Sequence, residues 1–216
     1  MSNFGFGHLR VVNPYEVAFR EARSAVGASQ ILANAREYSS VAEGVADCSL
    51  VVGTTAVRNR ELQHPLRELA SGARLLYQRS AERIAILFGS EKRGLSNDDL
   101  SHCHWLLHVP TVEEHPSMNL GQAVAVCLYE LSKMGTKASK STSGPRATTK
   151  ETERINIMLC DVLAASGYLK PKPSAASQEK IRRFVRRLDL SPEDAVAMLG
   201  MLRQMAWKLG LENDSK

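Results

Sequence analysis

Short apolar runs alternate with helical patterns along the first two thirds of the chain. Four runs predict strands, because each is short, apolar and followed by turn residues: Leu9–Val12, Ser49–Gly53, Ile84–Phe88 and Trp105–Val109. Apolar residues at helical spacing predict helices over Tyr15–Ala25, Ser40–Ala46, about His64–Leu69 and Asn119–Met134, with a connection over Ser71–Arg83. This alternation predicts an α/β fold, with a mostly parallel sheet covered on both faces.

The pattern changes after Met134. Residues Gly135–Lys150 are rich in small and polar residues, which is typical of a flexible linker. Three further helical patterns follow, over Glu151–Ser166, Ser177–Leu188 and Ser191–Leu209. We therefore expect an α/β domain over residues 1–134, a linker over 135–150 and a small C-terminal helical domain over 151–216.

Composition narrows the class of protein. The 216 residues are 44% hydrophobic, which is enough for a core and argues against global disorder. No apolar run is long enough to span a bilayer, and Met1–Val12 lacks the apolar segment of a signal peptide, so we expect a cytosolic protein without membrane contact. The net charge of +5 is compatible with an anionic partner.

Candidate chemistry lies in the two loops that follow the last two predicted strands. Gly89 and Gly94 allow a tight loop in which the backbone can approach a ligand. The polar loop Pro110–Pro116 leads into a predicted helix, whose first N–H groups can bind polar ligand atoms. Open parallel sheets place their ligands at this edge. These patterns alone predict a small-molecule site and leave the substrate open.

The residues of these loops resemble a known family. Gly89-x-Glu91-x-x-Gly94-Leu95, then Val109-Pro110, then Ser117-x-Asn119-Leu120 are similar to the second and third motifs of the SpoU (TrmH-type) branch of the SPOUT RNA methyltransferases, in order and in separation. The resemblance is greatest to the bacterial tRNA ribose 2'-O-methyltransferases that act on cytidine or uridine in the anticodon loop. It extends from Gly5 to about Lys208.

This resemblance implies the fold and the reaction. The expected fold is a SPOUT methyltransferase domain with a C-terminal trefoil knot, in a homodimer. S-adenosyl-L-methionine is the expected methyl donor, and a ribose 2'-hydroxyl of tRNA is the expected acceptor. A Rossmann-type dehydrogenase is disfavoured, because no GxGxxG pattern follows a predicted strand.

The resemblance also assigns candidate site residues. The expected catalytic residues are Glu91, Ser117 and Asn119; the expected cofactor-binding residues are Thr54, Thr55, Ala56, Gly89, Val109, Ser117, Met118 and Leu120. Without the resemblance, Glu91 would be read as a solvated surface acid, and Ser117 and Asn119 as helix caps. Met118 stands where the family commonly has leucine, a nearly isosteric change.

Basic residues cluster in the second helical pattern of the tail. The cluster consists of Lys180, Arg182, Arg183, Arg186 and Arg187. Spacings of three and four residues concentrate their charge on one side of a helix, which suits contacts with RNA phosphates; the alternative is an ordinary solvated face. His102, Cys103, His104 and His108 fit no common zinc pattern, so we expect no metal site.

One motif of the family is missing from this sequence. The first motif, Asn-x-Gly-x-x-x-Arg, carries the arginine that the family uses near the ribose hydroxyl, and Met1–Gly7 resembles the residues that follow it. We therefore expect Met1 to be an internal methionine, with a natural start about 20–30 residues earlier, enough for one strand and a turn. The alternative is a truncated chain that binds RNA or cofactor without catalysis.

Overall fold

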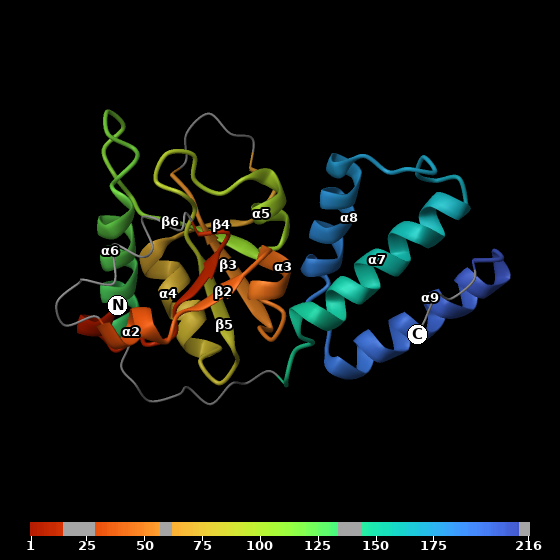
Figure 1. Cartoon of the computed structure of the whole chain (residues 1–216), viewed down its shortest axis with the longest axis horizontal. Helices are drawn as coiled ribbons and strands as arrows, with labels where there is room; N and C mark the ends of the chain where they lie inside the picture. Colours follow the sequence, from red (N-terminus) through yellow and green to blue (C-terminus); the bar gives the residue numbers. More distant parts are fainter. Residues whose placement is uncertain (15–28, 57–61, 134–143, 212–216) are drawn as a thin grey trace.

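The computed structural model describes residues 1–14, 29–56, 62–133 and 144–211 (Figure 1). The predicted helix over Tyr15–Ala25 and most of the predicted linker over 135–150 lie outside these ranges. None of the helices in the described ranges has the length and apolar character needed to cross a bilayer.

Strands and helices alternate through the first part of the chain. The strands are β1 Arg10–Val12, β2 Arg36–Tyr38, β3 Leu50–Thr54, β4 Leu66–Glu68, β5 Ile84–Leu87 and β6 Trp105–His108. The helices are the 3-10 turn η1 Ser2–Phe4, then α2 Ser29–Ala33, α3 Val41–Gly44, α4 Leu69–Gln78, α5 Asn97–Ser101, α6 Leu120–Ser132, α7 Thr149–Ala165, α8 Ala175–Arg187 and α9 Pro192–Lys208. The four predicted strands and the three C-terminal helices are confirmed.

One stretch differs from its prediction. Residues 64–69 were expected to be helical and Ser71–Arg83 a connection, whereas Leu66–Glu68 forms strand β4 and the helix α4 follows directly. The sheet partner decides this stretch, because β4 pairs with β6 along its whole length. Helix α4 begins at Leu69, where the predicted helix was expected to end. Its buried residues include Leu69, Ala73 and Leu76, which repeat at helical spacing.

The main sheet is parallel, as predicted. Its strand order is β4-β6-β3-β5, and every neighbouring pair of strands is parallel. β3 lies in the interior of the sheet, with Val52 opposite Ile86 of β5 and opposite Trp105 of β6. β1 and β2 form a separate two-stranded parallel sheet. All carboxyl ends of the main strands therefore meet at one edge.

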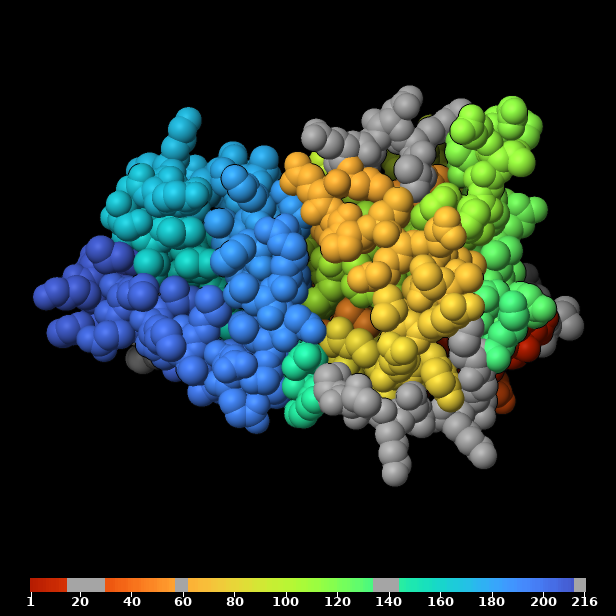
Figure 2. Space-filling model, turned by 180° about the vertical axis from the view of Figure 1, so that it is seen from behind, coloured from red at the N-terminus to blue at the C-terminus, as the bar shows by residue number. Residues whose placement is uncertain are grey.

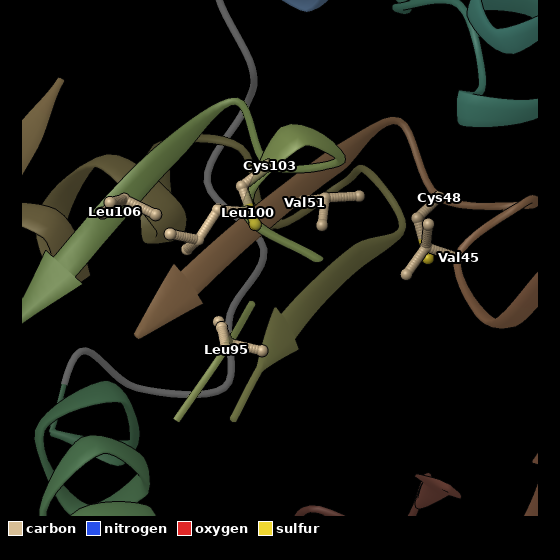
Figure 3. Packing of buried hydrophobic residues seen from close by; sticks show 7 residues of the cluster. All are labelled: Val45, Cys48, Val51, Leu95, Leu100, Cys103 and Leu106. Atoms are coloured by element: carbon tan, nitrogen blue, oxygen red, sulfur yellow. The ribbon is translucent and has the colours of Figure 1, made fainter. Parts of the chain in front are cut away.

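Helices cover both faces of the main sheet. One face of the sheet is covered by α4 and α6, and the other by α3 and α5. On β3, Leu50 and Val52 point to the first face and Val51 points to the second, as the two-residue period of a strand requires. These three side chains are fully buried, and each contributes about 1.5–3 kcal/mol through removal of apolar surface from water. Figure 3 shows the second of these clusters. Its members are Val45, Cys48, Val51, Leu95, Leu100, Cys103 and Leu106.

The three C-terminal helices form a cluster with a core of their own. Ile155 of α7, Val185 of α8 and Leu202 of α9 are buried together. The cluster lies on the side of the sheet opposite α6 (Figure 1), and its surface abuts the orange and yellow part of the chain when seen from behind (Figure 2). At the junction, the Thr149 N–H donates to the Cys48 carbonyl over 2.7 Å, so α7 begins against the connection between α3 and β3.

Candidate functional site

The predicted site residues follow three neighbouring strands. Thr54 ends β3 and Thr55 follows it, Gly89 lies after β5 and Val109 follows β6. The Thr54 hydroxyl donates to the Leu87 carbonyl over 2.9 Å, and the Thr55 N–H donates to the Leu107 carbonyl over 2.9 Å. These two bonds tie the end of β3 to both of its neighbours. The loops that leave β5 and β6 consequently start from fixed points on one edge of the sheet.

The Glu91 loop, residues Gly89–Leu95, closes on itself. The Gly94 N–H donates to the Ser90 carbonyl over 2.8 Å, and Gly94 has a left-handed φ of 68°. A side chain on Gly89 would overlap with the backbone of Gly94 and Leu95, so the loop requires a glycine at this position. The close approach that we expected from a ligand is made here by the loop's own backbone, and ligand contact at Gly89 stays a prediction.

Asn119 connects helix α6 to the Glu91 loop. Its side-chain oxygen accepts from the N–H groups of Gly121 and Gln122, at 2.8 and 3.4 Å, and so caps the helix. Its side-chain nitrogen donates to the Glu91 carboxylate over 2.6 Å. Capping and a role in the site are therefore compatible, as the sequence suggested. The structure brings together two candidate catalytic residues that are 28 positions apart.

The remaining candidates line the same region with different exposure. Glu91, Ser117, Asn119 and Ala56 are exposed. Thr54, Thr55, Val109, Met118 and Leu120 are half-buried. No hydrogen bond within the described ranges joins Ser117 to Glu91 or to Asn119, so its assignment to the site rests on its position beside the start of α6. The edge thus combines half-buried apolar side chains with a few exposed polar groups, which is the composition of a small-molecule site.

The basic residues of α8 do not form one exposed patch. Arg186 is 2% exposed, and its guanidinium contacts the Thr149 carbonyl, the Thr152 hydroxyl and the Glu153 carboxylate. Burial lowers its pKa to about 10, and the Glu153 charge opposes this shift. Because Arg186 is buried and its Nη atoms donate to protein groups, it presents no exposed charge to a phosphate in this structure, unlike the surface cation that the sequence pattern predicted.

The other basic residues divide into two groups. Arg182 lies in contact with Glu153 of α7 and with Asp98 and Ser101 of α5, and Arg183 donates to Gln63 over 2.6 Å. Lys180 and Arg187 are exposed and make no hydrogen bond or ion pair with any described residue. Sequence spacing places all five cations on one helix but does not tell which of them face another helix. Nothing in the sequence around Glu153 indicates that it pairs with Arg182 and Arg186.

His104, directly before β6, serves the fold. His104 accepts a hydrogen bond at Nδ1 from the Val51 N–H over 3.0 Å. Burial, reinforced by the charge of Arg186, lowers the pKa of His104 to about 4. The neutral ring thus completes the hydrogen bonding of β3. Among the residues that the structure describes, no cluster of three or more His, Cys, Asp or Glu side chains is arranged to hold a metal ion.

Comparisons with known proteins agree with this geometry. Residues 1–129 match the model of the SpoU rRNA methylase family. The tRNA (cytidine/uridine-2'-O-)-methyltransferase TrmJ of Sodalis glossinidius is 31% identical over 209 residues, which cover 94% of this chain and 82% of that protein. The same enzyme of Cronobacter sakazakii is 32% identical over 212 residues, with 94% and 86% covered.

Solved structures show the same likeness. The crystal structure of TrmJ from Z. mobilis ZM4 has a TM-score of 0.81 and 31% identity, and it covers 95% of this chain and 89% of that chain. A probable methylase family protein from Haemophilus influenzae has a TM-score of 0.56 and 29% identity, with 97% and 88% covered. The likeness thus includes the C-terminal helices as well as the sheet.

Proposed function

The chain belongs to the SpoU rRNA methylase family, and we propose that it transfers a methyl group from S-adenosyl-L-methionine to a ribose 2'-hydroxyl of tRNA. The observation that carries this proposal is the hydrogen bond from Asn119 to Glu91, because it joins the two motifs at the carboxyl edge of the sheet. The relatives named TrmJ support tRNA as the RNA and the ribose 2'-oxygen as the acceptor.

The residues at this edge fit S-adenosylmethionine. The ligand has a flat aromatic ring system, whose faces pack on apolar side chains, and polar groups; the edge offers half-buried Val109, Met118 and Leu120 beside the start of a 13-residue helix. Asn119 caps the second and third N–H groups of that helix, and within the described residues the Leu120 N–H has no partner. Free N–H groups at a helix start bind polar ligand atoms. When bound, the cofactor supplies an electrophilic methyl group.

The side chains have separate proposed roles. Asn119 holds one carboxylate oxygen of Glu91 and leaves the other to accept a hydrogen bond from the substrate hydroxyl. Ser117 offers a hydroxyl beside the same helix start. Thr54, Thr55, Ala56 and Gly89 are proposed to complete the cofactor pocket from the ends of β3 and β5. Catalysis in this scheme depends mainly on the alignment of ribose and methyl donor.

Four further features are proposed rather than observed. We propose a homodimer and a trefoil knot from family membership. We also propose that residues 1–134 form the methyltransferase domain and that residues 151–216 form a helical domain after a linker, which the separate core of α7, α8 and α9 supports. Lys180 and Arg187, the exposed cations of α8, are the proposed RNA contacts on that helix.

Two measurements side by side test the proposal. Calorimetry with S-adenosylhomocysteine reports cofactor binding, and an assay with labelled S-adenosylmethionine and tRNA reports turnover. We expect both to be positive. Binding without turnover would support the alternative function, which is RNA or cofactor binding without catalysis, and the absence of both would remove the proposed site.

A further inference from the structure

Arg182 joins the C-terminal helices to helix α5. Its Nη1 donates to the Ser101 hydroxyl over 2.7 Å and to the Asp98 carboxylate over 3.1 Å. Its Nε donates to Glu153 of α7 over 3.1 Å. The side chain of Arg182 is only 14% exposed, and Ser101 is fully buried. One guanidinium therefore links α8 to two other elements, α5 and α7.

Helix α5 continues directly from the Glu91 loop. Ser96 caps the helix, with its hydroxyl accepting from the Asp99 N–H and the Asp99 carboxylate accepting from the Ser96 N–H. Leu95 and Leu100, at the end of the loop and within the helix, are buried in one cluster (Figure 3). The loop and α5 are therefore packed into one core cluster, and a shift of the helix would displace Leu95 from it.

The Gly89 backbone lies against the other end of this unit. A side chain there would overlap with Gly94 and Leu95, so the two ends of the Glu91 loop are in direct contact. Arg182 bonds to Ser101, whose chain neighbour Leu100 packs in one cluster with Leu95; from Leu95 the closed loop leads to Glu91, which bonds to Asn119. The steps are hydrogen bonds, packed contacts and short stretches of the chain itself.

We infer that Arg182 is a positioning residue, which fixes the Glu91 loop in its working position by holding α5 against α8. This inference rests on the proposed methyl transfer and adds a role that the resemblance did not assign. The bond to buried Ser101 carries most of the effect, because hydrogen bonds from charged groups to buried partners are strong. The pair with Asp98 contributes less, since that carboxylate is 70% exposed and screened by water.

Three variants separate the interaction from the charge. Arg182→Met keeps the apolar stem and removes all three polar contacts. Arg182→Lys keeps the charge with a single point of contact and should restore part of the function. Ser101→Ala removes the buried acceptor without a change in charge, and it serves where Arg182→Met fails to fold. Arg146→Met is the matched control, because Arg146 pairs with Asp189 over 3.1 Å at the tail and makes no contact with α5 among the described residues.

The test combines hydrogen exchange with kinetics. In Arg182→Met, amide exchange over residues 89–101 should rise about tenfold, and kcat should fall about tenfold while the KM for tRNA changes by less than about threefold. Ser101→Ala should change both in the same direction, and Arg146→Met should change neither. If exchange rises only in α7 and α8, or if kcat is unchanged while residues 89–101 loosen, the inference is overturned.

The two readouts also separate the inference from the function that it rests on. Hydrogen exchange requires no methyl transfer. A wild-type protein without activity would therefore remove the proposed function, while the exchange result would still uphold or overturn the mechanical link between Arg182 and the Glu91 loop.

Discussion

The side-chain amide of Asn119 donates to the carboxylate of Glu91 over 2.6 Å, and its oxygen caps helix α6 at the same time. The two residues come from the loops that follow β6 and β5, the strands on either side of β3. Because the helix N–H groups require the oxygen of the amide, the nitrogen must face Glu91. The start of α6 and the Glu91 loop are thereby held in one arrangement.

Asn119→Asp tests this arrangement without loss of the cap. Aspartate caps helices as well as asparagine does, so the melting temperature should change little. A second carboxylate would then face Glu91, and affinity for S-adenosylhomocysteine should fall about tenfold or more, since a hydrogen bond to a charged group is replaced by repulsion. Calorimetry measures the affinity, and differential scanning calorimetry measures the melting temperature.

Two further variants provide the controls for that change. Asn119→Ser keeps a capping hydroxyl but is too short to reach Glu91, so it should weaken binding less than Asn119→Asp. Adding Glu91→Gln to Asn119→Asp supplies an amide donor to the new carboxylate and should restore part of the binding. An Asn119→Asp protein that binds as tightly as wild type would show that the contact has no part in the site.

The two glycines of the Glu91 loop should differ in their sensitivity to substitution. Gly89→Ala would place a carbon against the backbone of Gly94 and Leu95, and it should lower the free energy of unfolding by about 3 kcal/mol. Gly94→Ala meets no atom within 4 Å and is strained only by its left-handed φ, so it should cost about 1–2 kcal/mol. Urea denaturation measures both, and a larger loss in Gly94→Ala would contradict the described closure of the loop.

Stability and RNA binding should separate along helix α8. Arg186→Ala removes a buried guanidinium and leaves the half-buried Glu153 with one partner fewer, and it should lower the free energy of unfolding by about 3 kcal/mol. Charge reversal at Lys180 and Arg187 should leave stability within about 0.5 kcal/mol, weaken tRNA binding and flatten its dependence on salt. Filter binding over a range of salt concentrations measures the second effect. Unchanged tRNA affinity at low salt would mean that these two cations are an ordinary solvated surface.

Acid should destabilise the fold through His104. Its pKa is about 4 in the folded protein and near the ordinary value of 6.5 in the unfolded chain, so between these values the unfolded chain binds more protons. The neutral ring therefore makes its full contribution to the free energy of unfolding above about pH 6.5, and this contribution decreases as the pH falls toward 4. His104→Asn keeps an acceptor for the Val51 N–H but does not titrate. It should therefore reduce the acid-induced loss in the free energy of unfolding, by at most about 3 kcal/mol.

Chemical denaturation at pH 7 and at pH 4.5 measures this difference. The comparison between wild type and His104→Asn is needed because paired carboxylates also lose stability in acid; the Arg10 guanidinium, for example, lowers the pKa of Asp47. Equal slopes of stability against pH in the two proteins would exclude His104 as a source of acid sensitivity.

The sequence predicted the strands of the buried sheet because their apolar runs are continuous. Leu50, Val51 and Val52 are all fully buried, so the run has no polar interruption. Strand β4 was missed for the opposite reason: Leu66, Arg67 and Glu68 are all exposed at the edge of the sheet, and only pairing with β6 makes them a strand. Leu62, Leu66 and Leu69 are four and three residues apart, which is helical spacing, and this spacing led to the wrong prediction of a helix there.

Candidate site residues were predictable where a motif names them, but their partners were not. Glu91 and Asn119 stand in the two motifs, yet their hydrogen bond depends on how two loops meet at the edge of the sheet. Arg182 and Arg186 are basic residues at helical spacing, and the pattern cannot distinguish a solvated face from one that packs on α5 and α7. Such tertiary contacts join residues far apart in the chain and have no local periodicity.

The formation of a 2'-O-methylated nucleoside in tRNA tests the central claim most directly. A methyl group on the 2'-oxygen removes the nucleophile of alkaline cleavage, so tRNA treated with this protein and S-adenosylmethionine should yield an alkali-resistant dinucleotide after hydrolysis, detected by mass spectrometry. We predict that this dinucleotide forms with the wild-type protein and is greatly reduced with Asn119→Asp. A protein that binds S-adenosylhomocysteine and tRNA but produces only fully cleaved nucleotides would contradict the proposed methyl transfer.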